Sequence, residues 1–326
     1  MAAVTAVGLQ IATGVLITYP WEVIETTYKV TYQPKRSDQA VADEKTSNLA
    51  TVSKYTNSWN VASRIVQKEG YLGLLRGLLP SFTLTALYSF SLDLLSQAAF
   101  QTIQVNTPFQ FLILRESTTA FTRAAFSPLT TLVTRFIARP EARRVVPGPL
   151  AFHPGAIYRA CTSDAESGAD AGKSGSLKAL YTYNPRVMLL EASASLTAGL
   201  ANSLLVPPLV QLLYTFGSGS FLQLNSEGWQ QVGMLACVAS TGVLARLVNL
   251  ALDTVSKRLQ VQASHGSDDG IVCLRPMPYR GIRNAFARIV EEEGATSLFR
   301  GCGLYALSST TLAGLSVLVA VAEGQV

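Results

Sequence analysis

The chain has 326 residues, of which 48% are hydrophobic and 14% are charged, and its formal net charge at pH 7 is +5. So few charges for this length argue against soluble domains and favour a protein surrounded by lipid. Several apolar segments of about 20 residues also carry Ser, Thr, Gly and one or two charges, which is typical of helices facing a polar cavity rather than of a single-pass anchor. We expect no nucleic-acid partner.

Six membrane spans are predicted, at about residues 3–32, 78–100, 109–139, 185–206, 229–262 and 301–321. The first and third contain Pro20 and Pro128 in their interior, where a proline removes a backbone hydrogen bond and bends the helix. The first segment lacks a basic N-terminal region, so we expect a membrane span there rather than a removable presequence. The fourth span is predicted to stop at Pro207-Pro208.

The connections between spans differ in character. Residues 57–68 and 282–292 alternate apolar and polar positions with a helical period, which predicts two short amphipathic helices. The first is expected to end at Gly70, because glycine favours helix C-termini. Residues 140–176 form the longest connection, rich in Gly, Ser and Ala, and are predicted to be flexible.

Basic residues are concentrated in three segments. Residues 35–76, 135–178 and 257–300 hold 21 of the 26 Lys and Arg side chains, whereas the connections 101–108 and 207–228 hold none. Positively charged loops stay on the inner side of a membrane, so the three basic segments are predicted to share one side. Six spans with both termini on the opposite side follow.

An internal repeat underlies this pattern. The segment 69–77 begins with Glu-Gly and ends with Arg-Gly, and the segment 293–301 does the same. A weaker copy begins at Gly175 and reaches Pro185, with the same ten-residue spacing as Gly70 and Pro80. Three copies about a hundred residues apart predict one domain over 1–326 that is built from repeats 1–105, 106–224 and 225–326.

This organisation resembles the mitochondrial carrier family, in which each repeat has a proline-kinked helix, a short matrix surface helix and a second helix. The Glu-Gly and Arg-Gly motifs carry the resemblance, together with residues 253–260, which read Asp-Thr-Val-Ser-Lys-Arg-Leu-Gln. It implies an all-α membrane protein with six transmembrane helices in three pseudo-symmetric repeats. It also implies a multi-pass protein of the inner mitochondrial membrane, with both termini in the intermembrane space and no enzymatic activity.

The resemblance implies bound cardiolipin on the matrix side and no other cofactor. Helix N-termini and backbone amides would face the lipid phosphates there. The expected lipid-binding residues are Gly70, Arg76, Gly77, Gly175, Gly294, Arg300 and Gly301.

The family's matrix gate is where this chain departs from the pattern. In the family, an acid in each repeat pairs with a base in the next, so that three ion pairs close the cavity. The acid positions here hold Glu22, Thr130 and Asp253, and the base positions hold Glu25, Val133 and Ser256. Three carboxylates without a cation repel one another in a low-dielectric constriction, so this gate is predicted not to close by ion pairing.

Charges within spans are costly and indicate a transport pathway or an internal partner. Arg123 and Arg246 lie at the same depth on related helices, so a carrier would use them to bind an anionic substrate, with Glu191 or Arg186 setting selectivity. In the other interpretation these side chains neutralise one another, or pair with Glu116 and Glu22. Both interpretations stay open at this point, although internal pairing is the more common.

Nothing in the sequence indicates catalysis or a metal site. His153 and His265 stand alone, and the four cysteines have no ligand spacing. The degenerate gate favours an accessory or structural subunit of a respiratory-chain or ATP-synthase assembly. The apolar connection 207–228 would contact other membrane subunits. The alternative is an alternating-access transporter of a small anionic metabolite across the inner mitochondrial membrane.

Overall fold

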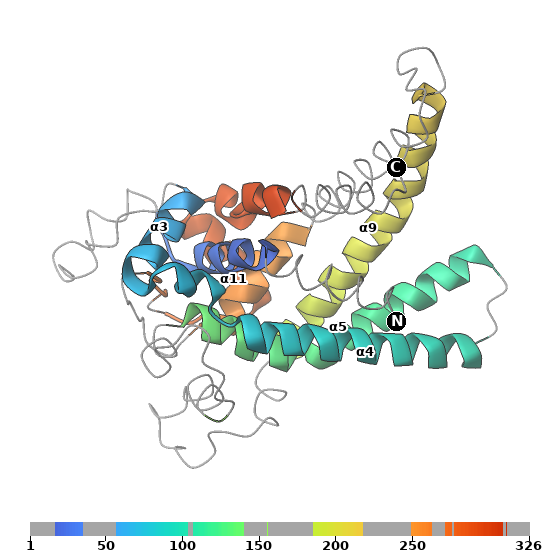
Figure 1. The fold of residues 1–326 in the computed structure, drawn as a ribbon, viewed down its shortest axis with the longest axis horizontal. Coiled ribbons are helices and arrows are strands. Elements are labelled where there is room, and N and C mark those ends of the chain that lie inside the picture. Colours follow the sequence, from blue (N-terminus) through green and yellow to red (C-terminus); the bar gives the residue numbers. More distant parts are fainter. Residues whose placement is uncertain are drawn as a thin grey trace.

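The computed structural model describes residues 17–34, 57–103, 107–139, 155, 185–217, 249–262, 271–275, 277–308 and 311. Within these ranges the chain is helical (Figure 1). The long helices are α4 (Leu78–Thr102), α5 (Pro108–Ala138) and α9 (Pro185–Gly217), and the short ones are α3 (Ser58–Glu69) and α11 (Ile282–Glu292). Further helices cover residues 17–30, 249–261 and 302–308. The predicted amphipathic helices are thereby confirmed as α3 and α11.

One predicted helix end is wrong. Span 4 was expected to stop at Pro207-Pro208, but α9 continues through both prolines to Gly217. A proline removes only its own backbone donor, and a transmembrane helix tolerates that loss where neighbouring groups compensate. The first half of the connection 207–228 is therefore helical, and its remainder lies outside the described residues.

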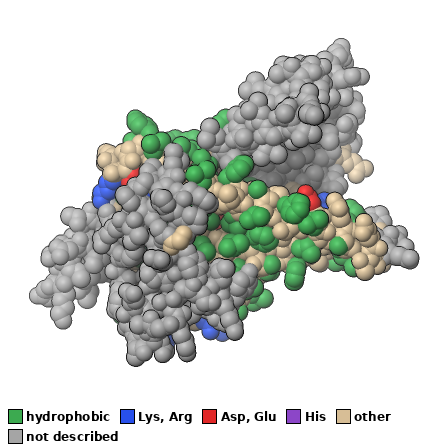
Figure 2. Space-filling model, turned by 60° about the horizontal axis from the view of Figure 1, so that its bottom comes forward, with side chains coloured by type: hydrophobic (Ala, Val, Ile, Leu, Met, Phe, Trp, Pro, Cys, Tyr) green, Lys and Arg blue, Asp and Glu red, His purple; other side chains and the backbone are tan. Residues whose placement is uncertain are grey.

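The α4 helix has the character of a lipid-facing element. Its apolar and polar residues are not separated onto two faces, and it has no buried residue. Hydrophobic side chains cover the face of the molecule on which α4 and α5 lie (Figure 2). By length and hydropathy alone, two described stretches, Tyr71–Thr102 and Pro185–Leu204, are able to cross a membrane.

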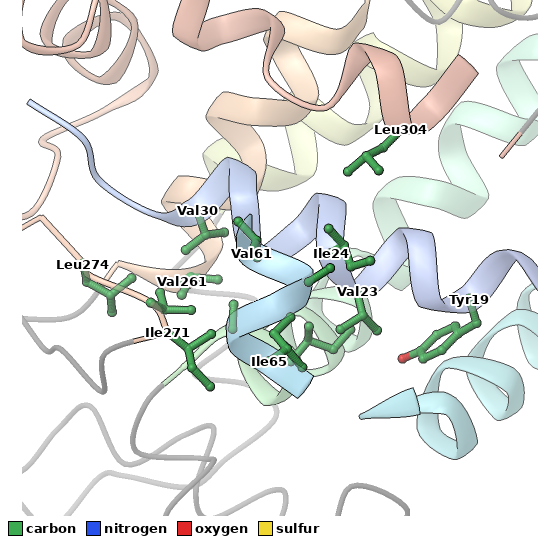
Figure 3. Close-up of a cluster of buried hydrophobic side chains, with 14 residues drawn as sticks. Tyr19, Val23, Ile24, Val30, Val61, Ile65, Val261, Ile271, Leu274 and Leu304 are labelled. Atoms are coloured by element: carbon green, nitrogen blue, oxygen red, sulfur yellow. The ribbon is translucent and has the colours of Figure 1, made fainter. Parts of the chain in front are cut away.

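The N-terminal and C-terminal parts of the chain share one buried cluster (Figure 3). Helix 17–30 and α3 contribute half of its buried residues, and Val261, Ile271 and Leu274 pack into it from the far end of the sequence. Beside it, the Trp21 and Trp59 rings meet edge to face with their centroids 5.6 Å apart. This cluster holds helix 17–30 against the end of helix 249–261.

The sequence repeat is also a repeat of local structure. Segments 69–77 and 293–301 both leave a surface helix, form a 3₁₀ turn (η1, Tyr71–Leu75; η3, Ala295–Phe299) and enter the next helix. In both, the glycine of the Arg-Gly pair has a positive φ, 81° at Gly77 and 87° at Gly301, a conformation that other residues rarely adopt. The third copy, at Gly175, lies outside the described residues, so the three-repeat division stays a prediction.

Candidate functional site

Lys29 connects helix 17–30 to helix 249–261. Its side chain is completely buried on helix 17–30, and its Nζ contacts the Glu25 carboxylate one turn earlier. The same Nζ lies 2.5 Å from Oδ2 of Asp253 on helix 249–261. Lys257 lies 3.8 Å from that carboxylate and donates to Thr26 Oγ1 at 3.0 Å. Two acids and two bases therefore neutralise one another across the interface.

The prediction of a gate without a partner cation is therefore wrong. Glu25 and Asp253 occupy positions where the family places a base and an acid, and two carboxylates would repel each other there. Lys29 lies between them because residues four apart share one face of a helix. The family motif ends before Lys29, so inspection of the motif positions alone missed the cation.

The other two pairs of gate positions, Thr130 with Ser256 and Glu22 with Val133, make different kinds of contact. Ser256 Oγ donates to Glu191 Oε1 at 2.8 Å and Gln260 Nε2 donates to the same oxygen at 3.3 Å, which joins helix 249–261 to α9. Val133 packs against the apolar cluster of helix 17–30. Thr130 Oγ1 donates to carbonyls of its own helix, and Glu22 is exposed. The contacts at the three pairs of positions therefore differ in kind: one is ionic, one is hydrogen-bonded and one is apolar.

Arginines satisfy the carbonyl groups that helix C-termini leave without partners. Arg258 donates to the carbonyl of Lys29 at 2.9 Å, and Arg135 donates to that of Gln260 at 2.7 Å. A cation at a helix C-terminus is also favoured by the helix dipole. These contacts fix the ends of neighbouring helices against one another just beyond the gate.

Both predicted lipid-binding arginines point inward. Arg76 is 1% exposed and donates to the carbonyl of Phe136 at 3.2 Å. Arg300 lies 2.6 Å from the buried Glu293 carboxylate, which Arg258 also contacts. These guanidinium groups therefore serve the protein interior, and cardiolipin binding by the glycine-containing turns stays a prediction.

The predicted substrate residues are only partly brought together. Arg123 on α5 is 38% exposed at its side chain, and its Nε lies 3.7 Å from Glu191 Oε2 on α9. Arg186 lies at the start of α9, where it donates to the carbonyl of Arg280. Arg246 lies outside the described residues. The described interior therefore contains one partly exposed cation with a long, weak ion pair.

A second ionic cluster lies beside α11. Arg275 donates to the two Glu292 carboxylate oxygens at 2.8 Å and 2.6 Å, and its guanidinium lies over the Tyr279 ring. Burial alone would raise the pKa of the Glu292 carboxyl, but the Arg275 contacts and a hydrogen bond from Tyr32 outweigh burial and lower the pKa below its usual value. This cluster ties the loop before α11 to α11 itself.

The family model for mitochondrial carrier proteins matches residues 1–95 and 230–320, which is more than half of the chain. The chain belongs to the mitochondrial carrier family. Carriers of this family are multi-pass proteins of the inner mitochondrial membrane, and they are transporters rather than enzymes. The match does not include residues 96–229, the part of the chain in which the repeat motif is weakest.

One curated relative is a Neurospora crassa protein whose name assigns it as a mitochondrial 2-oxoglutarate/malate carrier protein. It is 29% identical over 110 residues, which cover 34% of this carrier and 31% of the relative. The carrier thus matches about a third of the relative's length, and the relative's substrates come to this chain only as a proposal.

Proposed function

We propose that this carrier is an alternating-access transporter of a small anionic metabolite across the inner mitochondrial membrane. The observation that supports it best is the buried ion pair of Lys29 with Glu25 and Asp253. This pair joins two repeats at the matrix end of the interior, as a gate requires. The accessory-subunit hypothesis depended on a gate without a cation, and Lys29 removes that premise.

A gate of this kind is reversible because its charges can exchange protein partners for water. While the matrix side is closed, Lys29 compensates two buried carboxylates, and removal of either contact alone is costly. When the helices separate, water enters and solvates all the charges together. The ionic connection therefore favours the closed state without making the open state inaccessible.

Arg123 is the described cation best suited to bind an anion. Its side chain is partly exposed, and its ion pair with Glu191 is long at 3.7 Å. Glu191 keeps hydrogen bonds from Ser256 and Gln260 when Arg123 turns to another carboxylate. An incoming anion therefore displaces one weak contact and leaves no acid without partners. Arg246 is predicted to assist from the symmetry-related helix.

The name of the relative makes dicarboxylates the first substrates to test. Reconstituted in liposomes, the carrier is expected to take up labelled 2-oxoglutarate or malate in exchange for internal dicarboxylate. Arg123→Ala is expected to lower the initial rate at least about tenfold, because loss of a charged contact to an anion costs about 1.5–3 kcal/mol. Arg288→Ala, on the exposed face of α11, serves as the control.

Two outcomes would contradict the proposal. One is Arg123→Ala transport at the wild-type rate, and the other is the absence of uptake for every dicarboxylate tried. Purification in mild detergent as a stoichiometric complex with another subunit would restore the accessory hypothesis.

A further inference from the structure

Glu116 is a buried carboxyl in the interface between α5 and α9. The residue is 4% exposed, although it lies about 12 Å into a membrane-spanning helix. Its described contacts are long: Arg115 Nε lies 3.4 Å from Oε1, and Ser203 Oγ lies 3.5 Å from the same oxygen. Arg115 is itself largely exposed, so its charge is only partly directed at the buried acid.

Gly199 provides the space that Glu116 occupies. A Cβ atom at position 199 would lie 1.7 Å from Glu116 Oε2, which no real contact allows. The carboxyl group therefore lies directly on the backbone of α9. Any larger residue at position 199 would displace it, so the two positions form one structural unit.

The same interface carries the proposed substrate residue. Glu116 and Arg123 are seven residues apart on α5, which is two helical turns or about 10 Å along one face. Arg123 pairs with Glu191, and the Glu116 carboxyl lies against Gly199. Glu191 and Gly199 are both on α9. Figure 1 shows α5 and α9 meeting in this region. The interface between α5 and α9 thus holds both a buried acid with long contacts and the cation proposed to bind the anion.

The charged and titratable groups around Glu116 are few among the described residues. On α5 these are Arg115 and Arg123, and on α9 the nearest is Glu191. The α4 helix, which also packs on α5, contributes the Tyr88 hydroxyl and the exposed Asp93. A negative charge added to this interface therefore meets little compensation.

We propose that Glu116 is a proton-binding site that couples uptake of one proton to binding of an anion at Arg123. This inference rests on the proposed transport function and adds its coupling ion. When the anion displaces Glu191 from Arg123, the interface gains negative charge in a low-dielectric environment. That charge favours the neutral carboxylic acid at Glu116, and a proton-loaded acid in turn favours anion binding.

The proton balance is simple. One proton leaves water on the intermembrane-space side and forms an O–H bond on the Glu116 carboxylate while the anion binds. The same proton returns to water on the matrix side after the anion leaves. No other bond is made or broken, so the carrier would move anion and proton together.

The test uses the full-length carrier in liposomes with labelled malate as the probe. Making the outside one pH unit more acidic is expected to raise the initial uptake rate of the wild type several-fold over symmetrical pH. Glu116→Gln is expected to abolish that response, giving equal rates with and without the gradient. Asp93→Asn, which removes an exposed carboxyl on α4, is expected to keep the response.

A second measurement guards against a Glu116→Gln variant that fails to fold. Addition of malate to the wild type in weakly buffered detergent is expected to take up about one proton per bound malate, because linked binding is reciprocal. Gly199→Ala, which displaces the carboxyl, is expected to lower that number.

The outcomes separate the two proposals. The coupling proposal is overturned if malate uptake does not respond to the pH gradient, or if Glu116→Gln keeps the response. In both cases the transport proposal still stands. Malate binding without proton uptake also overturns the coupling. The absence of uptake for malate and for every other dicarboxylate tried overturns the transport proposal and the coupling with it.

Discussion

Lys29 combines complete burial with two carboxylate partners, and this determines what its removal does. A buried ion pair contributes little net stability, because desolvation of both charges offsets their attraction. Removing one partner is different, since the others stay buried without compensation. Without Lys29, the Glu25 and Asp253 carboxylates would face each other without the buried cation between them, and Lys257 lies farther away, at 3.8 Å from Asp253.

Lys29→Gln is therefore expected to lower the free energy of unfolding by about 3–5 kcal/mol, the usual cost of breaking a buried pair. Thermal unfolding of the purified carrier in detergent measures this. Lys68→Gln, on the exposed face of α3, is the matched control and is expected to change stability by less than about 0.5 kcal/mol.

The double variant Lys29→Gln/Asp253→Asn sharpens this prediction. It removes one of the two uncompensated carboxylates, so it is expected to recover part of the stability lost in the single variant. Equal stability of Lys29→Gln and Lys68→Gln would show that Lys29 does not compensate the acids.

Sequence reasoning reached these residues unevenly. It found Glu25 and Asp253 at the gate positions of the family motif, and it found Arg123 and Glu191 because charges inside apolar segments stand out. It missed Lys29 because the family motif ends two positions earlier, although the four-residue spacing from Glu25 was a usable signal. The contact of the Glu116 carboxyl with the backbone at Gly199 could not be predicted, since it depends on how two helices distant in sequence approach each other.

At the scale of elements, the loop before α11 is held by the Arg275–Glu292 pair. Because the folded protein lowers the pKa of Glu292, the pair contributes stability at pH values above the ordinary carboxyl pKa. That contribution is lost as the pH falls through the lower pKa of the folded state. Neutral pH is therefore where the pair matters most.

Arg275→Gln is expected to reduce thermal stability at pH 7, and the difference from the wild type is expected to shrink as the pH falls below about 4. Melting temperatures of both proteins measured between pH 3.5 and pH 7 in one detergent test this. A difference that is constant over this range would mean that Glu292 is not the group through which Arg275 acts.

The elements show which sequence signals are reliable. Strong periodicity located α3 and α11 within a residue or two, because an amphipathic helix needs its apolar positions on one face. The end of α9 was mistaken because Pro207-Pro208 was treated as a stop signal. Proline breaks a helix only when nothing compensates the lost hydrogen bond, and the surroundings of a helix are not visible in its own sequence.

For the whole molecule, the distribution of basic residues predicts orientation. The connection 101–108 should lie in the intermembrane space and the loop before α11 in the matrix. Ile103 is 49% exposed and Met277 is 68% exposed, so cysteines at these positions would report the two sides.

In a background with the four native cysteines replaced by alanine, Ile103→Cys is expected to react with an impermeant maleimide in mitoplasts. Met277→Cys is expected to react only after detergent is added. Mass shift on a gel measures both. Labelling of Met277→Cys in intact mitoplasts would reverse the predicted orientation.

At the scale of the whole molecule, the features that could be predicted were those for which the sequence contains a repeated pattern. Charge distribution and the Glu-Gly to Arg-Gly segments both indicated a tripled membrane fold, and family membership agrees with them. The unequal gate was not visible, because each of its three connections uses a residue outside the repeated motif or a different kind of contact.

The edge-to-face contact between Trp21 and Trp59 has a practical consequence. These are two of only three tryptophans in the chain, and Trp21 lies beside the first gate position. Any motion that tilts helix 17–30 away from α3 changes the distance and angle between the two indoles. The carrier thus contains its own optical reporter, whose emission and near-ultraviolet circular dichroism would follow the movement of helix 17–30 relative to α3 without an attached label.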